Sequence, residues 1–231
     1  MSERFFLAAV PERGRATLTG DEARHLSRVL RAREGDAIVV FAGTAAEWPA
    51  RIVRIGRDEV ELAIDEPRHD PPRGGPRLTL AVALPKGDRQ KWLVEKLTEL
   101  GVDRLVPLVT LRGVAEATES ARARLARTVI EACKQCGRNT LLEIAAPMRV
   151  ADLLAAAEPG SRAVVADPEA PPLERPIMAG ATEIVGLVGP EGGFTPEERA
   201  AAAAAGAIRA GLGPHVLRVE TAAVALAARL A

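Results

Sequence analysis

Aromatic residues are scarce in this sequence of 231 residues, which contains no tyrosine, four phenylalanines and two tryptophans. A protein that binds nucleic acid mainly by stacking bases needs several aromatic platforms, so stacking is disfavoured as the main binding mode. Net charge is absent as well, because lysine plus arginine and aspartate plus glutamate both total 31. That balance argues against a protein that coats nucleic acid through bulk charge, while it leaves room for a local basic surface.

Cysteine and histidine are also few. Cys133 and Cys136 form a lone C-x-x-C, and the histidines stand apart at positions 25, 69 and 215. A zinc site needs more clustered ligands, so no metal is expected and the cysteines are interpreted as reduced residues of a helix. No apolar run approaches the ~20 residues that span a bilayer, and the N-terminus has too short an apolar core for a secretory signal. We expect a cytoplasmic protein without membrane contact.

The N-terminal part reads mostly as short strands with β-branched or alternating residues, at 4–8, 36–43, 47–56 and 59–65. One helix, within 19–36, interrupts them. It would place Leu26, Val29 and Leu30 on one face, and Arg24, Arg28 and Arg31 on another. This pattern predicts a compact β-barrel with one helix.

A proline-rich segment then separates two domains. Residues 66–77 hold four prolines and two glycines without apolar periodicity, which is typical of a linker. We place the N-terminal domain at 1–68, the linker at 69–77 and the C-terminal domain at 78–231.

The C-terminal part alternates between strands and helices, which predicts an α/β domain with a mostly parallel sheet. The expected strands are 77–84, 103–109, 162–167, 182–189 and 207–213. The expected helices are 88–100, 121–136, 150–157, 195–205 and 220–231.

A glycine loop follows the apolar strand that ends at Val188. It reads Gly189-Pro190-Glu191-Gly192-Gly193, and Thr195-Pro196-Glu197-Glu198 then forms a capping box at the start of a helix. In open α/β sheets ligands lie beyond the carboxyl ends of strands, where this loop is expected. The glycine patterns of nucleoside triphosphate and dinucleotide sites are both absent. By itself the loop is better explained as a tight strand-to-helix turn than as a ligand site.

A second loop of the same kind strengthens the case for a site. Leu212-Gly213-Pro214 again stands between an apolar strand and a helix, and Arg218, Glu220 and Thr221 follow at the start of that helix. Glu220 would also be favourable there as an acid near the positive end of the helix dipole.

The two stretches LVGPEGGFTPEE and LGPHVLRVETAAV together resemble the signature of the bacterial small-subunit (16S) ribosomal RNA uridine-N3 methyltransferases, members of the SPOUT superfamily. ARHLSRVLRAREGD, LPKGDRQKWLVEKLTELGV and EACKQCGRN fit the same family, so the resemblance covers almost the whole chain in order.

The resemblance implies a PUA-like RNA-binding barrel followed by a SPOUT domain with a deep trefoil knot. It also implies S-adenosylmethionine bound in the knot, a homodimer, and methylation of N3 of one uridine in small-subunit RNA or in the assembled subunit. The matching positions of the cofactor site are Leu187, Val188, Gly189, Glu191, Gly192, Gly193, Leu212, Gly213, Leu217 and Thr221.

Two positions depart from the family pattern: His215 stands where arginine is usual, and Val219 where threonine is common. Uridine N3 carries a proton, so the enzyme has to remove it and stabilise negative charge on the uracil oxygens. Arg218 is the candidate for charge stabilisation, and Glu220 or Glu191 for the proton acceptor. Alternatively, Arg218 and Glu220 only pair with each other and hold the knot.

Basic residues mark the expected RNA surface, because arginines are concentrated between positions 13 and 33. The candidates are Arg4, Arg24, His25, Arg28, Arg31, Lys86 and Arg138. Two other functions fit the same sequence. One is a SPOUT methyltransferase acting on another RNA, and the other is a non-catalytic RNA-binding factor for ribosome assembly, which need not bind S-adenosylmethionine.

Overall fold

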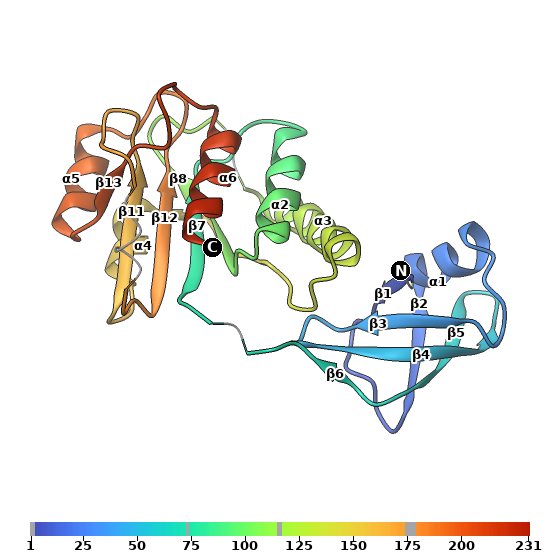
Figure 1. The fold of residues 1–231 in the computed structure, drawn as a ribbon. Coiled ribbons are helices and arrows are strands. Elements are labelled where there is room, and N and C mark those ends of the chain that lie inside the picture. The colour runs from blue at the N-terminus through green and yellow to red at the C-terminus, as the bar shows by residue number, and fades with distance from the viewer. Residues whose placement is uncertain (1–2, 73, 115–116, 174–178) are drawn as a thin grey trace. The chain divides into compact units, whose positions relative to one another are not determined.

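The computed structural model describes residues 3–72, 74–114, 117–173 and 179–231 (Figure 1). Contacts within the chain divide it into two compact units. The first unit contains Met1–Arg73 together with Ile130–Leu141, and the second contains Gly74–Val129 together with Leu142–Ala231. The first unit is therefore discontinuous in sequence, since it includes a segment that follows the linker.

The first unit is built on a curled sheet with strand order β1-β3-β4-β5-β2, with β6 paired to β4. Its strands are β1 (Arg4–Phe6), β2 (Arg15–Thr19), β3 (Ala37–Phe41), β4 (Ala46–Ile55), β5 (Glu59–Ile64) and β6 (Arg68–His69). All of these pairs are antiparallel except β1 with β3. The side chains of β4 alternate between the core and the outer face, so that Trp48, Ala50 and Ile52 are buried. The four expected strands are confirmed, whereas β2 and β6 were not predicted.

The helix of this unit is shorter than predicted. It consists of α1 (Gly20–Arg24) and one π-helical turn, η1 (His25–Val29), and Arg31 then takes a left-handed conformation with φ 52°. The wider turn changes which side chains share a face. Leu26 is fully buried, while Val29 is 66% exposed. The predicted common face of Leu26, Val29 and Leu30 is therefore wrong, because the helix does not keep a period of 3.6 residues.

A buried polar network connects β1 to the segment that follows helix α3 (Glu119–Cys136). The Arg4 guanidinium bonds to Glu47 and donates at 2.7 Å to the Asn139 side chain, which donates at 2.6 Å to Asp70. Asn139 is only 3% exposed. Nearby, Lys134 donates to Glu22 at 2.9 Å. These contacts explain why residues 130–141 belong to the first unit.

The second unit is built on a parallel sheet of seven strands, in the order β10-β8-β7-β12-β11-β13 with β9 beside β8. The strands are β7 (Arg77–Val82), β8 (Arg104–Val109), β9 (Glu143–Ile144), β10 (Met148–Arg149), β11 (Ser161–Ala166), β12 (Glu183–Val188) and β13 (Ile208–Ala210). Every pair is parallel, which confirms the expected sheet. The two-residue strands β9 and β10 were not predicted, because they are too short to show a pattern.

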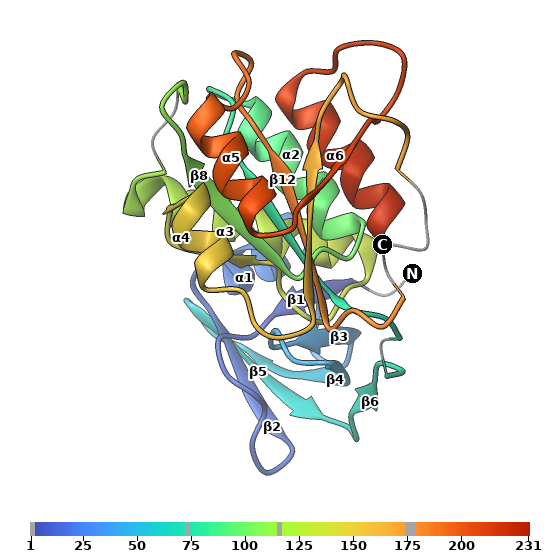
Figure 2. The same ribbon diagram turned by 90° about the vertical axis from the view of Figure 1, so that its left-hand side faces the viewer.

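Helices cover both faces of this sheet (Figures 1 and 2). Helices α4 (Val150–Ala155) and α5 (Pro196–Ala204) lie on one face, where Val185 and Leu187 of β12 join their apolar core. Helices α2 (Arg89–Glu99) and α6 (Val219–Leu230) lie on the other. The five helices expected in the C-terminal part are confirmed to within two residues at each end.

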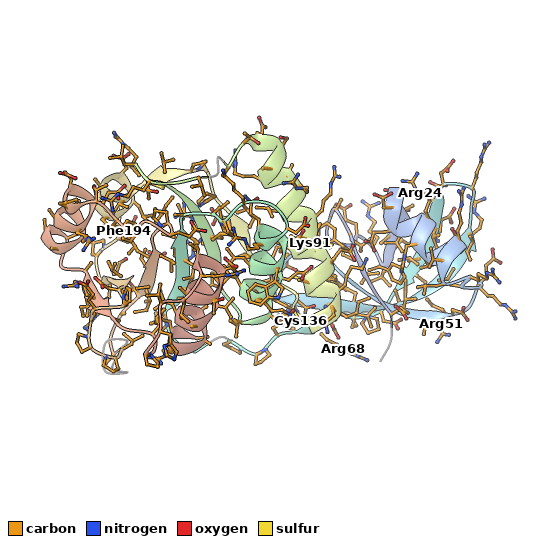
Figure 3. All side chains as sticks on the ribbon, turned by 90° about the horizontal axis from the view of Figure 1, so that it is seen from above. Arg24, Arg51, Arg68, Lys91, Cys136 and Phe194 are labelled. Atoms are coloured by element: carbon orange, nitrogen blue, oxygen red, sulfur yellow. The ribbon has the colours of Figure 1, made fainter. Side chains whose placement is uncertain are left out.

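The cysteine interpretation also agrees with the structure. Cys133 is buried and Cys136 is exposed, and both are free thiols on α3. Figure 3 labels Cys136. Burial raises the pKa of the Cys133 thiol to about 11, so little thiolate is available for redox chemistry.

Gly186 in the centre of β12 is predicted to be intolerant of any side chain. A Cβ there would lie 2.8 Å from a methyl group of Leu226 on α6 and 3.0 Å from one of Leu80 on β7. We expect Gly186→Ala to lower the free energy of unfolding by about 1–3 kcal/mol through overpacking. Thermal or urea unfolding measures this. Gly213→Ala, where nothing lies within 4 Å, is the matched control and should leave stability near wild type.

Asn139 gives a second stability prediction. Asn139→Ala removes the acceptor of Arg4 and the donor to Asp70, so two partly buried charged groups lose a partner. We expect a loss of about 1–3 kcal/mol, measured by urea unfolding. An unchanged midpoint would show that the network contributes nothing to the first unit.

Candidate cofactor pocket and active site

A pocket of about 270 Å³ opens at the carboxyl edge of the parallel sheet. Its walls are the loops that follow β11, β12 and β13, closed by the first turns of α5 and α6. This position is the one at which open α/β sheets bind ligands. Apolar side chains form much of the lining, among them Val165, Leu187, Val188, Leu212 and Leu217.

The glycine loop forms one wall with a tight turn. The Gly193 N–H donates to the Pro190 carbonyl at 2.8 Å, and Gly193 has φ 68°, which favours glycine. A Cβ at Gly189 would lie 3.1 Å from the ring of Phe194, which is buried in the same wall (Figure 3). The glycines thus allow both the turn and the close packing of Phe194.

The helix after this loop begins as the sequence predicts. Thr195 accepts a hydrogen bond from the Glu198 N–H, and the Glu198 carboxylate accepts one from the Thr195 N–H. Its other carboxylate oxygen accepts from the Leu111 N–H at 3.1 Å. The capping box therefore fixes one end of the pocket wall and also connects it to the loop after β8.

Carboxylates outnumber guanidinium groups in the lining. Arg199 and Arg209 face four acids, which are Asp167, Glu169, Glu191 and Glu198. The Arg209 Nε donates to Asp167 at 2.7 Å, and this hydrogen bond holds the pKa of the Asp167 carboxyl group below its usual range. The pocket therefore favours a ligand that carries positive charge or hydroxyl donors.

Arginines that the sequence analysis did not select hold the pocket loops from outside. Arg112 donates to the Gly192 carbonyl at 2.6 Å. Arg229, near the end of α6, donates to the carbonyls of Gly211 and Leu212 at 3.3 and 3.2 Å. Each guanidinium satisfies backbone acceptors of a loop, which keeps that loop in one conformation. No sequence pattern marks these partners, since they lie 17 to 80 residues from the groups they bind.

Most of the predicted cofactor positions lie together in the pocket wall. They are Leu187, Val188, Gly189, Glu191, Gly193, Leu212, Gly213 and Leu217. Gly192 and Thr221 do not line it. The two residues that depart from the family pattern, His215 and Val219, both line the pocket. His215 is exposed, whereas Val219 is buried, so an apolar residue suits position 219. Asp167 and Glu169 were missed, although their place at and just beyond the carboxyl end of a predicted strand could have indicated them.

The two predicted catalytic residues lie next to the pocket without lining it. Arg218 is exposed at the N-cap of α6, between Leu217 and Val219 of the wall. Glu220 is buried, and its ion pair is with Arg89 at 3.5 Å. Within the described residues no ion pair joins Arg218 to Glu220, so the alternative in which the two residues pair only with each other is wrong.

The predicted RNA-binding residues have very different surroundings. Arg24, His25, Arg28, Arg31 and Lys86 are exposed, and Arg24 pairs with Asp21 in the same helix (Figure 3). Arg4 is different, because its side chain is only 11% exposed and is occupied by Glu47 and Asn139. Arg138 is partly buried and donates to Thr140 at 3.2 Å. We therefore propose no RNA contact for Arg4.

The structure also bears on metal and membrane binding. Among the described residues, no three histidine, cysteine or acidic side chains come together as a metal site. None of the described helices is both long and apolar enough to cross a bilayer.

Sequence families identify the two parts of the chain. Residues 73–231 match the family described as RNA methyltransferase domain, and residues 18–65 match the RNA methyltransferase PUA domain. Ribosomal RNA small subunit methyltransferase E of Mycobacterium bovis is 32% identical over 238 residues, which cover 97% of this chain and 89% of that protein.

Solved structures of similar proteins indicate the same family. Ribosomal RNA small subunit methyltransferase E of Neisseria gonorrhoeae, bound to S-adenosylmethionine, superposes with a TM-score of 0.88 at 29% identity and covers 99% of this chain and 96% of its own. A Legionella pneumophila protein in complex with the same cofactor has a TM-score of 0.87 at 27% identity, with 100% and 97% coverage. With a family match over most of its length and a mycobacterial relative aligned almost from end to end, the chain belongs to the SPOUT RNA methyltransferases, in the family named ribosomal RNA small subunit methyltransferase E.

Proposed function

We propose that this protein transfers the methyl group of S-adenosylmethionine to N3 of a uridine in small-subunit ribosomal RNA. The observation that carries the proposal is the pocket at the carboxyl edge of the sheet, which the glycine loop and the 212–217 loop both line. Relatives of the same family are named for methylation of small-subunit RNA, and two similar structures contain the cofactor.

The residues of the pocket fit S-adenosylmethionine. The side chains of Leu187, Leu212 and Leu217 offer an apolar slot for an adenine ring, and the surrounding loops offer backbone donors and acceptors. The excess of carboxylates suits a cationic sulfonium and ribose hydroxyl groups, and Glu191 is the acid of the glycine loop itself. When bound, the cofactor would supply an electrophilic methyl group.

The chain has to provide two further functions, removal of the N3 proton and stabilisation of charge on the uracil oxygens. Glu191 is half-exposed and lines the pocket, so it is the better placed proton acceptor, because Glu220 is buried and does not line the pocket. Arg218 is exposed beside the wall, with no ion pair among the described residues, and could orient the base or stabilise its charge. Held in place, these groups would also align donor and acceptor.

Binding of RNA is assigned to the exposed basic residues. Arg24, His25, Arg28 and Arg31 follow one another on and after the short helix of the first unit, where they can contact phosphates without reading sequence. Lys86 lies at the carboxyl edge of the parallel sheet, directly before α2. Arg138 remains a weaker candidate, because it is partly occupied by Thr140.

We also propose that the chain forms the trefoil knot of this family. A trefoil knot is supported by the backbone around Gly211, whose N–H donates to Pro171 at 2.7 Å and whose carbonyl accepts from Leu173 at 3.4 Å. The loops after β11 and β13 therefore run side by side, as a threaded chain requires. We also propose a homodimer that works in the cytoplasm, where its substrate RNA is made.

The function is tested with S-adenosylmethionine labelled in its methyl group. We expect the label at N3 of a single uridine when the protein is incubated with small subunits that lack this modification. Naked small-subunit RNA and transfer RNA are the comparison substrates, and mass spectrometry locates the label. Label on transfer RNA would show that the protein is a methyltransferase with a different RNA substrate. Absence of cofactor binding in calorimetry would instead support the assembly factor.

Arg218 is tested separately from cofactor binding. Because its guanidinium is expected to act on the uracil, Arg218→Ala should lower kcat about 100-fold and leave the Kd of S-adenosylmethionine unchanged. Arg162→Ala removes an exposed arginine near the amino end of β11, away from the pocket, and serves as the control. Undiminished turnover in the Arg218 variant would remove this residue from the chemistry.

A further inference from the structure

Glu220 lies in the first turn of α6, and it is buried, with 6% of its surface exposed. A carboxylate that has lost its water needs a compensating charge. The group that provides it is Arg89, whose Nη1 lies 3.5 Å from Glu220 Oε2. No other ion pair to Glu220 is present among the residues that the structure describes.

The same nitrogen of Arg89 also lies close to an acid of the pocket wall. It lies 3.7 Å from Oε1 of Glu191, the acid of the glycine loop. Arg89 is the first residue of α2, which begins just beyond the carboxyl end of β7, and α6 begins at the same edge of the sheet (Figure 1). One guanidinium thus connects the first turns of two helices to the loop that lines the pocket.

Burial falls steadily along this row of three side chains. Glu220 is 8% exposed in its side chain, Arg89 is 39% exposed and Glu191 is 48% exposed. The innermost group therefore has the least freedom to move and the outermost group the most. A guanidinium carries five donors in a rigid plane, so it can hold both carboxylates at once.

We propose that Arg89 is a positioning residue: anchored by the buried Glu220, it holds Glu191 in the orientation that receives the cofactor and the uracil. The inference rests on the proposed function of the pocket and adds a residue to it. Glu220 then acts through Arg89 and does not itself touch the reacting atoms.

Other basic residues of α2 have no such role. Lys91 pairs at 3.8 Å with Glu95 one turn along the helix and is 69% exposed (Figure 3). Lys96 likewise pairs with Glu99. These are solvated helix pairs of small energetic effect. Lys91→Gln therefore removes the same charge from the same helix and is the matched control.

The test is a double-mutant cycle read by calorimetric binding of S-adenosylmethionine. We expect Arg89→Gln and Glu191→Gln each to raise the Kd about tenfold, and the double variant to raise it no further, because both changes break one arrangement. Lys91→Gln should bind as wild type does. Independent effects that multiply to about a hundredfold, or wild-type affinity in Arg89→Gln, would overturn the proposal.

A second comparison separates positioning from stability. Arg89→Gln should lower the Tm of the cofactor-free protein by about 5 °C, since Glu220 is left buried without its cation. Adding Glu220→Gln removes that charge and should restore most of the Tm while the Kd stays about tenfold weaker. If the double variant recovered the wild-type Kd as well as the Tm, the role of Arg89 would be structural only, and the proposal would be overturned. Label transfer by the wild-type protein tests the proposed function independently of both comparisons.

Discussion

The parallel pairing of β7, β12, β11 and β13 places every part of the site. Parallel strands end at the same edge, so loops that are far apart in the sequence must meet there. The helices that return along the two faces begin at that edge as well, which brings the first turns of α5 and α6 to the pocket and that of α2 close to Glu191. The packing of α6 on the sheet also requires Gly186 of β12, because α6 lies too close to this position for a side chain to fit.

Guanidinium groups then fix the loops that the sheet brings together. Arg112 holds the glycine loop, Arg229 holds the loop after β13, and Arg209 holds Asp167 of the loop after β11. Loop backbone at a ligand site has few partners of its own, and five donors on a rigid plane satisfy several acceptors at once. The pocket is therefore organised before a ligand enters, which reduces the ordering that binding would require.

The first unit shows a different dependence on tertiary structure. Its sheet closes over a core of alternating side chains, yet Arg4 and Glu22 find their partners in residues 134–139, beyond the linker. A segment of the chain that reads as the end of a long helix thus belongs to a domain that precedes it. The linker composition marked where the chain leaves the barrel, and could not show that the chain returns to it.

The sequence by itself determined most of the longer elements, the parallel sheet and the position of the glycine loops. Apolar periodicity, capping residues and glycines act over a few neighbours, and they are therefore visible in the order of residues. The resemblance added the family and most of the pocket wall. Tertiary structure alone decided which charged and polar groups meet. Arg89 with Glu220, Arg112 with Gly192 and Arg4 with Asn139 join residues from 80 to 135 positions apart, because ion pairs and hydrogen bonds depend on distance in space and leave no spacing in the sequence.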